Sequence, residues 1–247
     1  MLFIIRAVLV IACVILMSVY SIFYCLLSPR NPKNTYHFAM LFSKMSRILG
    51  LKVTLRVPES AKNNGSVVYI ANHQNNYDMV TTTASVQPGS VTIGKKSLVW
   101  IPFFGIIYWL TGNILIDRDN KSKSKNTITD VVEQMRAKNI GVWIFPEGTR
   151  SRGRGLMPFK MGAFHTALQA GVNVVPVVVS DTHGQIKLNR WDNGEVIVEM
   201  LEPIDITLYK KREIRRLMND SRAIMLEKFE QLNKEAKRPD NNTDCCG

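Results

Sequence analysis

Cysteine is scarce in this chain of 247 residues, which has only four. Cys13 and Cys25 lie in an apolar N-terminal segment, and Cys245 and Cys246 lie in a polar tail, so no spacing is typical of a disulfide framework or a metal site. The distribution excludes the class of small secreted proteins that are stabilised by disulfides. It favours a reducing compartment.

The sequence also lacks the motifs of several enzyme classes. It has no Gly-x-Ser-x-Gly elbow, no Walker loop, no Gly-x-Gly-x-x-Gly fingerprint and no His-Glu-x-x-His zinc motif. Three histidines, His37, His165 and His183, have no metal-ligand spacing. The sequence therefore gives no support for a covalent serine acyl-enzyme, and it implies no metal or redox cofactor.

Acidic residues are few: 20 Asp and Glu stand against 32 Lys and Arg, which gives a net charge of +12. Such a charge attracts anionic membrane, an acidic carrier protein or nucleic acid, and charge alone does not choose among them. The chain has no zinc-finger spacing and no aromatic RNA-binding signature, so we expect no nucleic-acid partner. A non-catalytic basic protein that binds anionic membrane or nucleic acid is the alternative from another function class.

An uncharged N-terminal segment runs from Ala7 to Leu27, enough for about 32 Å of helix, which is close to the hydrocarbon thickness of a bilayer. Arg6 would suit the start of a signal peptide, but the segment is long for one and no Ala-x-Ala site follows. Tyr36 to Leu49 is predicted to form a second, interfacial helix. We therefore expect membrane-anchor helices in residues 1–50, and the sequence leaves open whether the first spans the bilayer or dips into one leaflet.

The remainder reads as an alternation of strands and helices, which predicts an α/β fold with a largely parallel sheet flanked by helices. Residues 51–237 would form the catalytic domain and 238–247 a disordered tail. Strands are expected at 51–57, 66–71, 90–93, 113–116, 141–145, 173–179 and 195–201. Helices are expected at 77–86, 122–138, 159–170 and 212–236.

Two polar segments each follow an apolar, β-branched run: Asn72 to Asp78 (NHQNNYD) and Phe145 to Ser151 (FPEGTRS). Loops at strand ends are where open α/β sheets build their sites. The first segment offers an imidazole with a carboxylate five residues on. The second offers a carboxylate, a glycine and a guanidinium. Together they suggest a base, the group that orients it and an anion clamp.

The spacing of His73 and Asp78 requires a turn, because residues five apart on one α-helix point about 140° apart. A strand end that turns into a helix could bring them together, so that Asp78 accepts the Nδ1 proton and Nε2 is free to act as a base. In the alternative, His73 caps a turn and Asp78 is the N-cap of a helix.

Four blocks in order resemble the glycerolphosphate acyltransferases, and within them the members that act on 1-acyl-glycerol 3-phosphate. The blocks are Asn72–Asp78, Gly112–Arg118 (GNILIDR), Phe145–Ser151 and Val175–Ser180 (VPVVVS). A linking stretch, Gly94 to Gly105, is similar as well. The resemblance implies acyl transfer from acyl carrier protein or coenzyme A to the 2-hydroxyl of lysophosphatidic acid, which gives phosphatidic acid, at the cytoplasmic face of the inner membrane.

The resemblance also implies roles for individual residues. His73 would be the base and Asp78 its partner, while residues of the second and third blocks would bind the acceptor: Arg118, Glu147, Gly148, Thr149 and Arg150. The arginines would take the phosphate, and Glu147 and Gly148 would shape the pocket. Without the resemblance, Asp117 with Arg118 and Glu147 with Arg150 would suit local ion pairs. Glycerol 3-phosphate or another lysophospholipid is the alternative acceptor.

Overall fold

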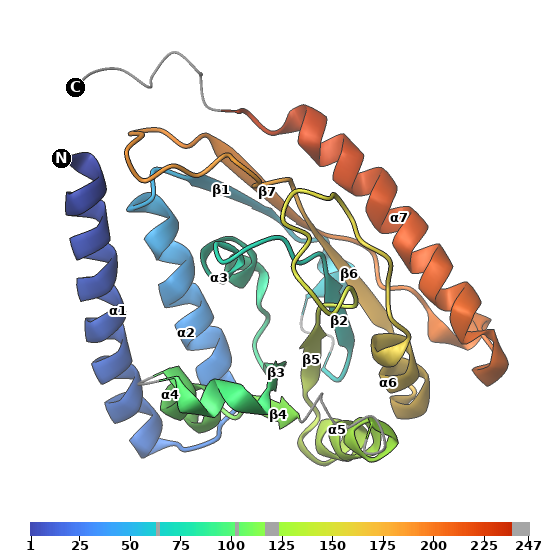
Figure 1. Cartoon of the computed structure of the whole chain (residues 1–247). Helices are drawn as coiled ribbons and strands as arrows, with labels where there is room; N and C mark the ends of the chain where they lie inside the picture. Colours follow the sequence, from blue (N-terminus) through green and yellow to red (C-terminus); the bar gives the residue numbers. More distant parts are fainter. Residues whose placement is uncertain (63–64, 102–103, 117–123, 239–247) are drawn as a thin grey trace.

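A seven-stranded sheet forms the centre of the molecule (Figure 1). The computed structural model describes residues 1–62, 65–101, 104–116 and 124–238. The strand order is β1-β7-β6-β2-β5-β3-β4, and every described pair is parallel except β6 with β7. The bounds are β1 Lys52–Arg56, β2 Val68–Ala71, β3 Ser90–Lys95, β4 Ile114–Ile116, β5 Gly141–Ile144, β6 Val174–Val179 and β7 Glu195–Met200. All seven predicted strands and the largely parallel sheet are confirmed.

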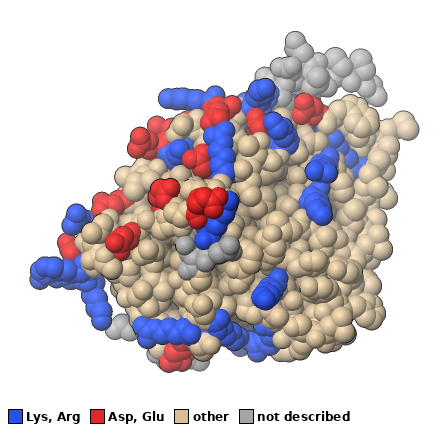
Figure 2. All heavy atoms as spheres, turned by 180° about the vertical axis from the view of Figure 1, so that it is seen from behind, with Lys and Arg blue, Asp and Glu red and all other residues tan. Residues whose placement is uncertain are grey.

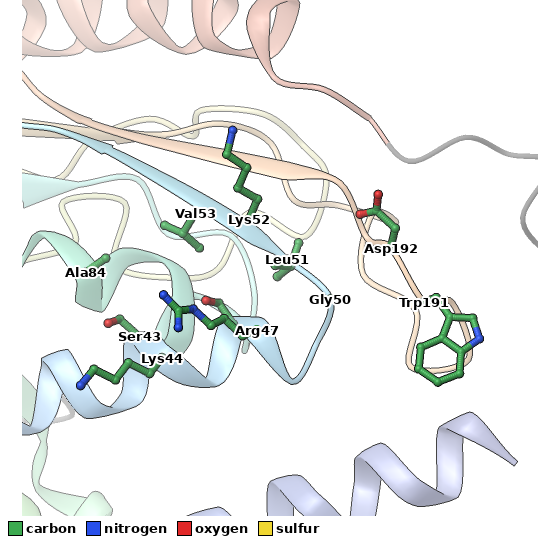
Figure 3. Close-up of a pocket in the computed structure, with 11 residues that line it drawn as sticks. Ser43, Lys44, Arg47, Gly50, Leu51, Lys52, Val53, Ala84, Trp191 and Asp192 are labelled. Carbon is green, nitrogen blue, oxygen red and sulfur yellow. The ribbon is translucent and has the colours of Figure 1, made fainter.

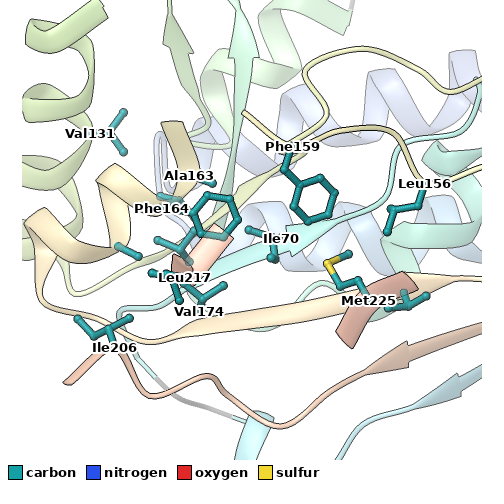
Figure 4. Packing of buried hydrophobic residues seen from close by; sticks show 14 of the residues in the cluster. Ile70, Val131, Leu156, Phe159, Ala163, Phe164, Val174, Ile206, Leu217 and Met225 are labelled. Atoms are coloured by element: carbon teal, nitrogen blue, oxygen red, sulfur yellow. The ribbon is translucent and has the colours of Figure 1, made fainter. Parts of the chain in front are cut away.

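Both faces of the sheet are buried. Successive side chains of a central strand point to opposite faces, and helices cover each face. In β2, Val68 and Ile70 belong to a core that packs under α5 (Ser124–Lys138), α6 (Gly162–Ala170) and α7 (Ile214–Glu235), part of which is drawn in Figure 4. Tyr69 and Ala71 point to the other core, which is covered by α2 (Lys33–Lys44) and α3 (Asp78–Thr81). The central strands are therefore held from both sides.

The predicted helices are found at the expected places in the chain, but several differ from the prediction in length. α1 runs over Leu2–Leu27, five residues earlier than the uncharged run, and α2 begins before the predicted Tyr36. The predicted helix at 77–86 is the short α3 followed by a 3₁₀ turn, η3 (Thr82–Ser85). A further helix, α4 (Phe104–Leu110), was not predicted. It lies in an uncharged stretch whose apolar residues show no helical period.

α1 is the one helix in the described part of the chain that is long and apolar enough to cross a membrane, with a mean hydropathy of 2.9. Most of its large apolar side chains are exposed. On the back of the molecule the side of α1 carries few charges, whereas Lys, Arg, Asp and Glu gather toward the side of α7 (Figure 2). α1 thus gives the protein a surface for membrane association.

Both ends of α1 contact the rest of the chain. Near the start, the buried Arg6 guanidinium donates hydrogen bonds to the carbonyls of Leu188 (3.3 Å), Arg190 and Trp191 (2.8 Å). At the other end α4 packs against α1. Gly50 permits the Arg6 contact: it has φ +67°, and a Cβ there would lie 2.6 Å from Arg6 Nη2. α1 therefore lies along the domain.

Replacing Arg6 with Met should loosen this contact, because methionine fills a similar space but donates no hydrogen bond to the three carbonyls. We expect a loss of about 1 to 3 kcal/mol in unfolding free energy. Thermal unfolding in detergent measures it. Arg215→Met, on the exposed face of α7, is the matched control and should change little. Equal midpoints for Arg6→Met and the native chain would contradict the role given to Arg6.

Candidate active site

The two polar segments lie together at one edge of the sheet. β2 and β5 are parallel neighbours, so the loops at their carboxyl ends emerge side by side. Two backbone hydrogen bonds join them: Ser151 N–H donates to His73 O (2.8 Å) and Arg152 N–H donates to Gln74 O (3.0 Å). The first and third motif blocks therefore form one site.

His73 and Asp78 form a hydrogen-bonded pair within this site. His73 Nδ1 lies 2.6 Å from Asp78 Oδ2. The same oxygen accepts the backbone N–H groups of Gln74 (2.7 Å) and Asn75 (3.3 Å). The loop therefore curls around one carboxylate oxygen, and this curl brings residues five apart into contact. The alternative in which Asp78 is an N-cap is wrong, since Asp78 is the first residue of α3 and its side chain points back into the loop.

The imidazole is fixed in position but keeps one nitrogen accessible. Its ring stacks on Phe145, with the centroids 4.2 Å apart. The His73 side chain is 21% exposed, whereas that of Asp78 is only 5% exposed. Nδ1 faces Asp78, and Nε2 has no hydrogen-bond partner among the residues that the structure describes. Nε2 is thus the atom of this pair that a substrate hydroxyl could reach.

Glu147 links the two loops from below the surface. Its Oε1 accepts the backbone N–H of His73 (2.7 Å) and its Oε2 accepts that of Met157 (3.0 Å). The residue is buried, and burial raises the pKa of its carboxyl while the two N–H groups oppose the shift. Both oxygens are engaged with the backbone. The local ion pair with Arg150, which was the alternative without the resemblance, is not formed among the described residues. The contacts of Glu147 are those of a residue that positions His73.

Amide side chains in the first block attach its loop to the end of β6. Asn72 continues the ladder with both groups: Nδ2 donates to Val179 O (2.9 Å) and Oδ1 accepts Val179 N–H (2.8 Å). Gln74 Nε2 donates to Ser180 O (2.8 Å), and its Oε1 accepts Thr182 N–H (2.8 Å). The sequence prediction assigned no role to these amides. The signal was present, since the block has four amides after one strand, and amide side chains can take the place of missing backbone partners.

The other predicted acceptor residues lie at the surface beside this pair. Gly148, Thr149 and Arg150 are exposed. Gly148 has φ +68°, which glycine adopts readily, and a Cβ there would approach Lys160 Nζ to 2.8 Å. The Arg150 guanidinium forms no ion pair or hydrogen bond with residues in the described ranges. Arg118 lies outside the described residues, so its predicted place beside the site stays a prediction.

A separate groove of about 610 Å³ opens beside the start of β1 (Figure 3). Its polar lining includes three cations and one carboxylate, and Ala84 of η3 borders it. Lys52 is already paired with Glu195 at 3.0 Å. None of the predicted site residues lines this groove. The strand-end loops with His73 and Glu147 are therefore separate from this groove.

Comparison with known proteins agrees with this geometry. Residues 52–180 match the acyltransferase family model, and the chain belongs to this family. A 1-acyl-sn-glycerol-3-phosphate acyltransferase of Escherichia coli is 54% identical over 95% of this chain and 96% of its own length. The protein of the same name from Haemophilus influenzae is 48% identical over 95% and 98%.

A solved structure has the same fold. The crystal structure of the 1-acyl-sn-glycerophosphate acyltransferase from Thermotoga maritima covers 94% of this chain and 98% of its own, with a TM-score of 0.73 and 23% identity. The likeness extends over nearly the whole chain, so it includes the N-terminal helices as well as the sheet. The predicted fold class is confirmed.

Replacing Glu147 with Gln tests how the site is held. An amide has one acceptor oxygen, so either His73 N–H or Met157 N–H would face an NH₂ group. We expect a loss of about 1 to 3 kcal/mol in unfolding free energy, together with slower acyl transfer. Chemical denaturation in detergent and an initial-rate assay measure the two effects. Glu230→Gln, exposed on α7, is the control, and an unchanged stability of Glu147→Gln would refute the linking role.

Proposed function

We propose that this enzyme transfers an acyl group from a thioester donor to the 2-hydroxyl of 1-acyl-glycerol 3-phosphate, and so makes phosphatidic acid. The observation that carries the proposal is the 2.6 Å contact of His73 Nδ1 with Asp78 Oδ2 in a chain whose relatives bear this activity in their names. The pair supplies a base, and the neighbouring loop supplies an exposed guanidinium.

The proposed reaction is a direct transfer. His73 Nε2 takes the proton of the acceptor hydroxyl while its oxygen attacks the thioester carbonyl. Asp78 accepts the Nδ1–H bond, so it holds the productive tautomer and stabilises the imidazolium. When the tetrahedral intermediate collapses, the carbon–sulfur bond breaks and the leaving thiolate takes the proton from Nε2. Each step uses only these side chains and the two substrates, so we propose that no cofactor takes part.

The positive charge of the protein supports the proposal that its acceptor and its acyl donor are both anionic. Arg150 is proposed to bind the acceptor phosphate, since a guanidinium can form two parallel hydrogen bonds to it. Arg118 is proposed for the same phosphate on the basis of its motif. Acyl carrier protein and coenzyme A are both anionic, and the net charge of +12 would attract either one.

We further propose that the protein works at the cytoplasmic face of the inner membrane. The exposed apolar face of α1 supports attachment to lipid, and the contacts at both its ends support a helix that lies along one leaflet. An acceptor with an acyl chain stays in the lipid. An enzyme held at the headgroup level can therefore reach the acceptor hydroxyl while a water-soluble donor approaches from the cytoplasm.

His73→Ala should lower transfer by about 100- to 10,000-fold, the usual worth of a positioned base. Asp78→Asn should cause comparable damage, because an amide facing Nδ1 disfavours the productive tautomer. Purified protein, lysophosphatidic acid and a labelled acyl thioester give the rates. His165→Ala, an exposed histidine of α6, should behave as native. Near-normal turnover of folded His73→Ala would overturn the mechanism.

Arg150→Ala should raise the KM for lysophosphatidic acid and leave the KM for the acyl donor nearly unchanged. A charge-assisted contact predicts a loss on the order of 1.5 to 3 kcal/mol in kcat/KM. Arg150→Lys should recover only part, since lysine keeps the charge but cannot form the bidentate contact. Arg212→Ala, exposed before α7, is the control. Equal effects on both substrates would argue against a phosphate contact.

A further inference from the structure

A second apolar surface lies outside α1, on η4 and α4 between β3 and β4. η4 (Lys96–Trp100) buries none of its residues, and Trp100 is 85% exposed. Val99 and Ile101 beside it are exposed, and α4 adds Ile106 (54%) and Trp109 (47%). The opposite side of α4 packs inward through Ile107 and Leu110. A soluble surface rarely gathers side chains of this size, so they indicate a partner.

This surface, formed by Val99, Trp100, Ile101, Ile106 and Trp109 and here named the η4–α4 surface, adjoins the end of α1. α4 packs against α1, and Figure 1 shows it crossing the foot of α1 and α2. Arg30, just after α1, donates its backbone N–H to Leu110 O at 2.7 Å. The last residues of α1 are apolar and exposed, as is the neighbouring Phe23. The η4–α4 surface is therefore continuous with the face already assigned to lipid.

Its composition fits the membrane–water boundary. Trp is enriched at that boundary, where the ring lies among headgroups and its N–H reaches water. Lys95 and Lys96 precede the η4–α4 surface, and no acidic residue occurs between them and Ile116. The Arg30 guanidinium lies 5.4 Å from the centre of the Trp109 ring. Cations beside exposed indoles suit the anionic headgroups of a leaflet, and the continuity with α1 favours lipid as the partner.

We propose that the η4–α4 surface is a second membrane contact, which inserts into the same leaflet as α1. η4 leaves the carboxyl end of β3, and β3 runs parallel to β5 and, through it, to β2. The second contact is therefore at the edge of the sheet that carries His73 and Glu147. Two contacts fix the orientation of the domain, whereas α1 alone would let it turn about the helix axis. The active-site edge is thus held against lipid.

Tryptophan quenching tests this insertion in the full-length protein. Vesicles of phosphatidylcholine and phosphatidylglycerol, brominated at defined acyl positions, quench indoles by depth. The chain has four Trp, so the signal of Trp100 is the difference between native protein and Trp100→Phe. We expect that difference to be quenched, most strongly by the shallowest bromine. An unquenched Trp100 in protein that floats with the vesicles would overturn the proposal.

An activity comparison tests what the contact does. Trp100→Glu should lower kcat/KM on vesicle-borne lysophosphatidic acid on the order of 10-fold, from the lost burial of one large side chain. The rate on detergent-dispersed acceptor should stay native. Leu208→Glu, an exposed apolar residue beside α7 at 71% exposure, is the matched control and should change neither rate. Equal losses in both assays, or the same loss in Leu208→Glu, would contradict the proposal.

A second copy of the chain is the other occupant that could cover the η4–α4 surface. Sedimentation in detergent distinguishes the two, because a protein interface would be disrupted by Trp100→Glu. A shift from dimer to monomer in that variant would overturn the membrane assignment. An unchanged sedimentation coefficient supports it. The quenching measurement requires no turnover, so it stands even where the proposed acyl transfer fails.

Discussion

The active-site edge depends on one carboxylate oxygen, Asp78 Oδ2. It accepts the imidazole N–H and two backbone N–H groups, all within 3.3 Å. Three donors on a buried oxygen stabilise its negative charge and give the loop its curvature. The orientation of His73 is therefore a property of the whole loop. The contact with His73 and the curvature of the loop therefore depend on the same atom.

Most other polar side chains of the site form hydrogen bonds with backbone groups. Glu147 gives both oxygens to the backbone, and the amides of Asn72 and Gln74 close the gap to β6. Such preorganised contacts cost nothing to reorganise during the reaction. In the described part of the site, His73 Nε2 and the exposed Arg150 guanidinium have no hydrogen-bond partner, so we propose that they contact the acceptor. In the proposed reaction, one group would activate the acceptor hydroxyl and the other would hold the acceptor phosphate.

The sheet could be predicted from the sequence because each buried strand is a short β-branched run bounded by turn residues. The strand order and the reversed direction of β1 and β7 could not, since pairing is set by contacts between distant segments. α4 was missed because it lies in an uncharged stretch of the sequence, where no alternation of apolar and polar residues marks a helix. The type and spacing of His73 and Asp78 left the N-cap alternative open, and their roles as base and partner were predicted from the resemblance of their block. The linking role of Glu147 was not, because its partners are backbone N–H groups, which every residue carries.

The position of the site follows from the two phases that its substrates occupy. In the proposed function, an acyl chain keeps the acceptor in lipid and a charged carrier keeps the donor in water, so we expect His73 to face the boundary between them. In this fold the carboxyl ends of β2, β3 and β5 share one edge. Loops at that edge provide both the base and the exposed indole of Trp100. Under this proposal, the rigid parallel sheet keeps the lipid contact of Trp100 and the base His73 at a fixed distance from each other, which a flexible tether could not do.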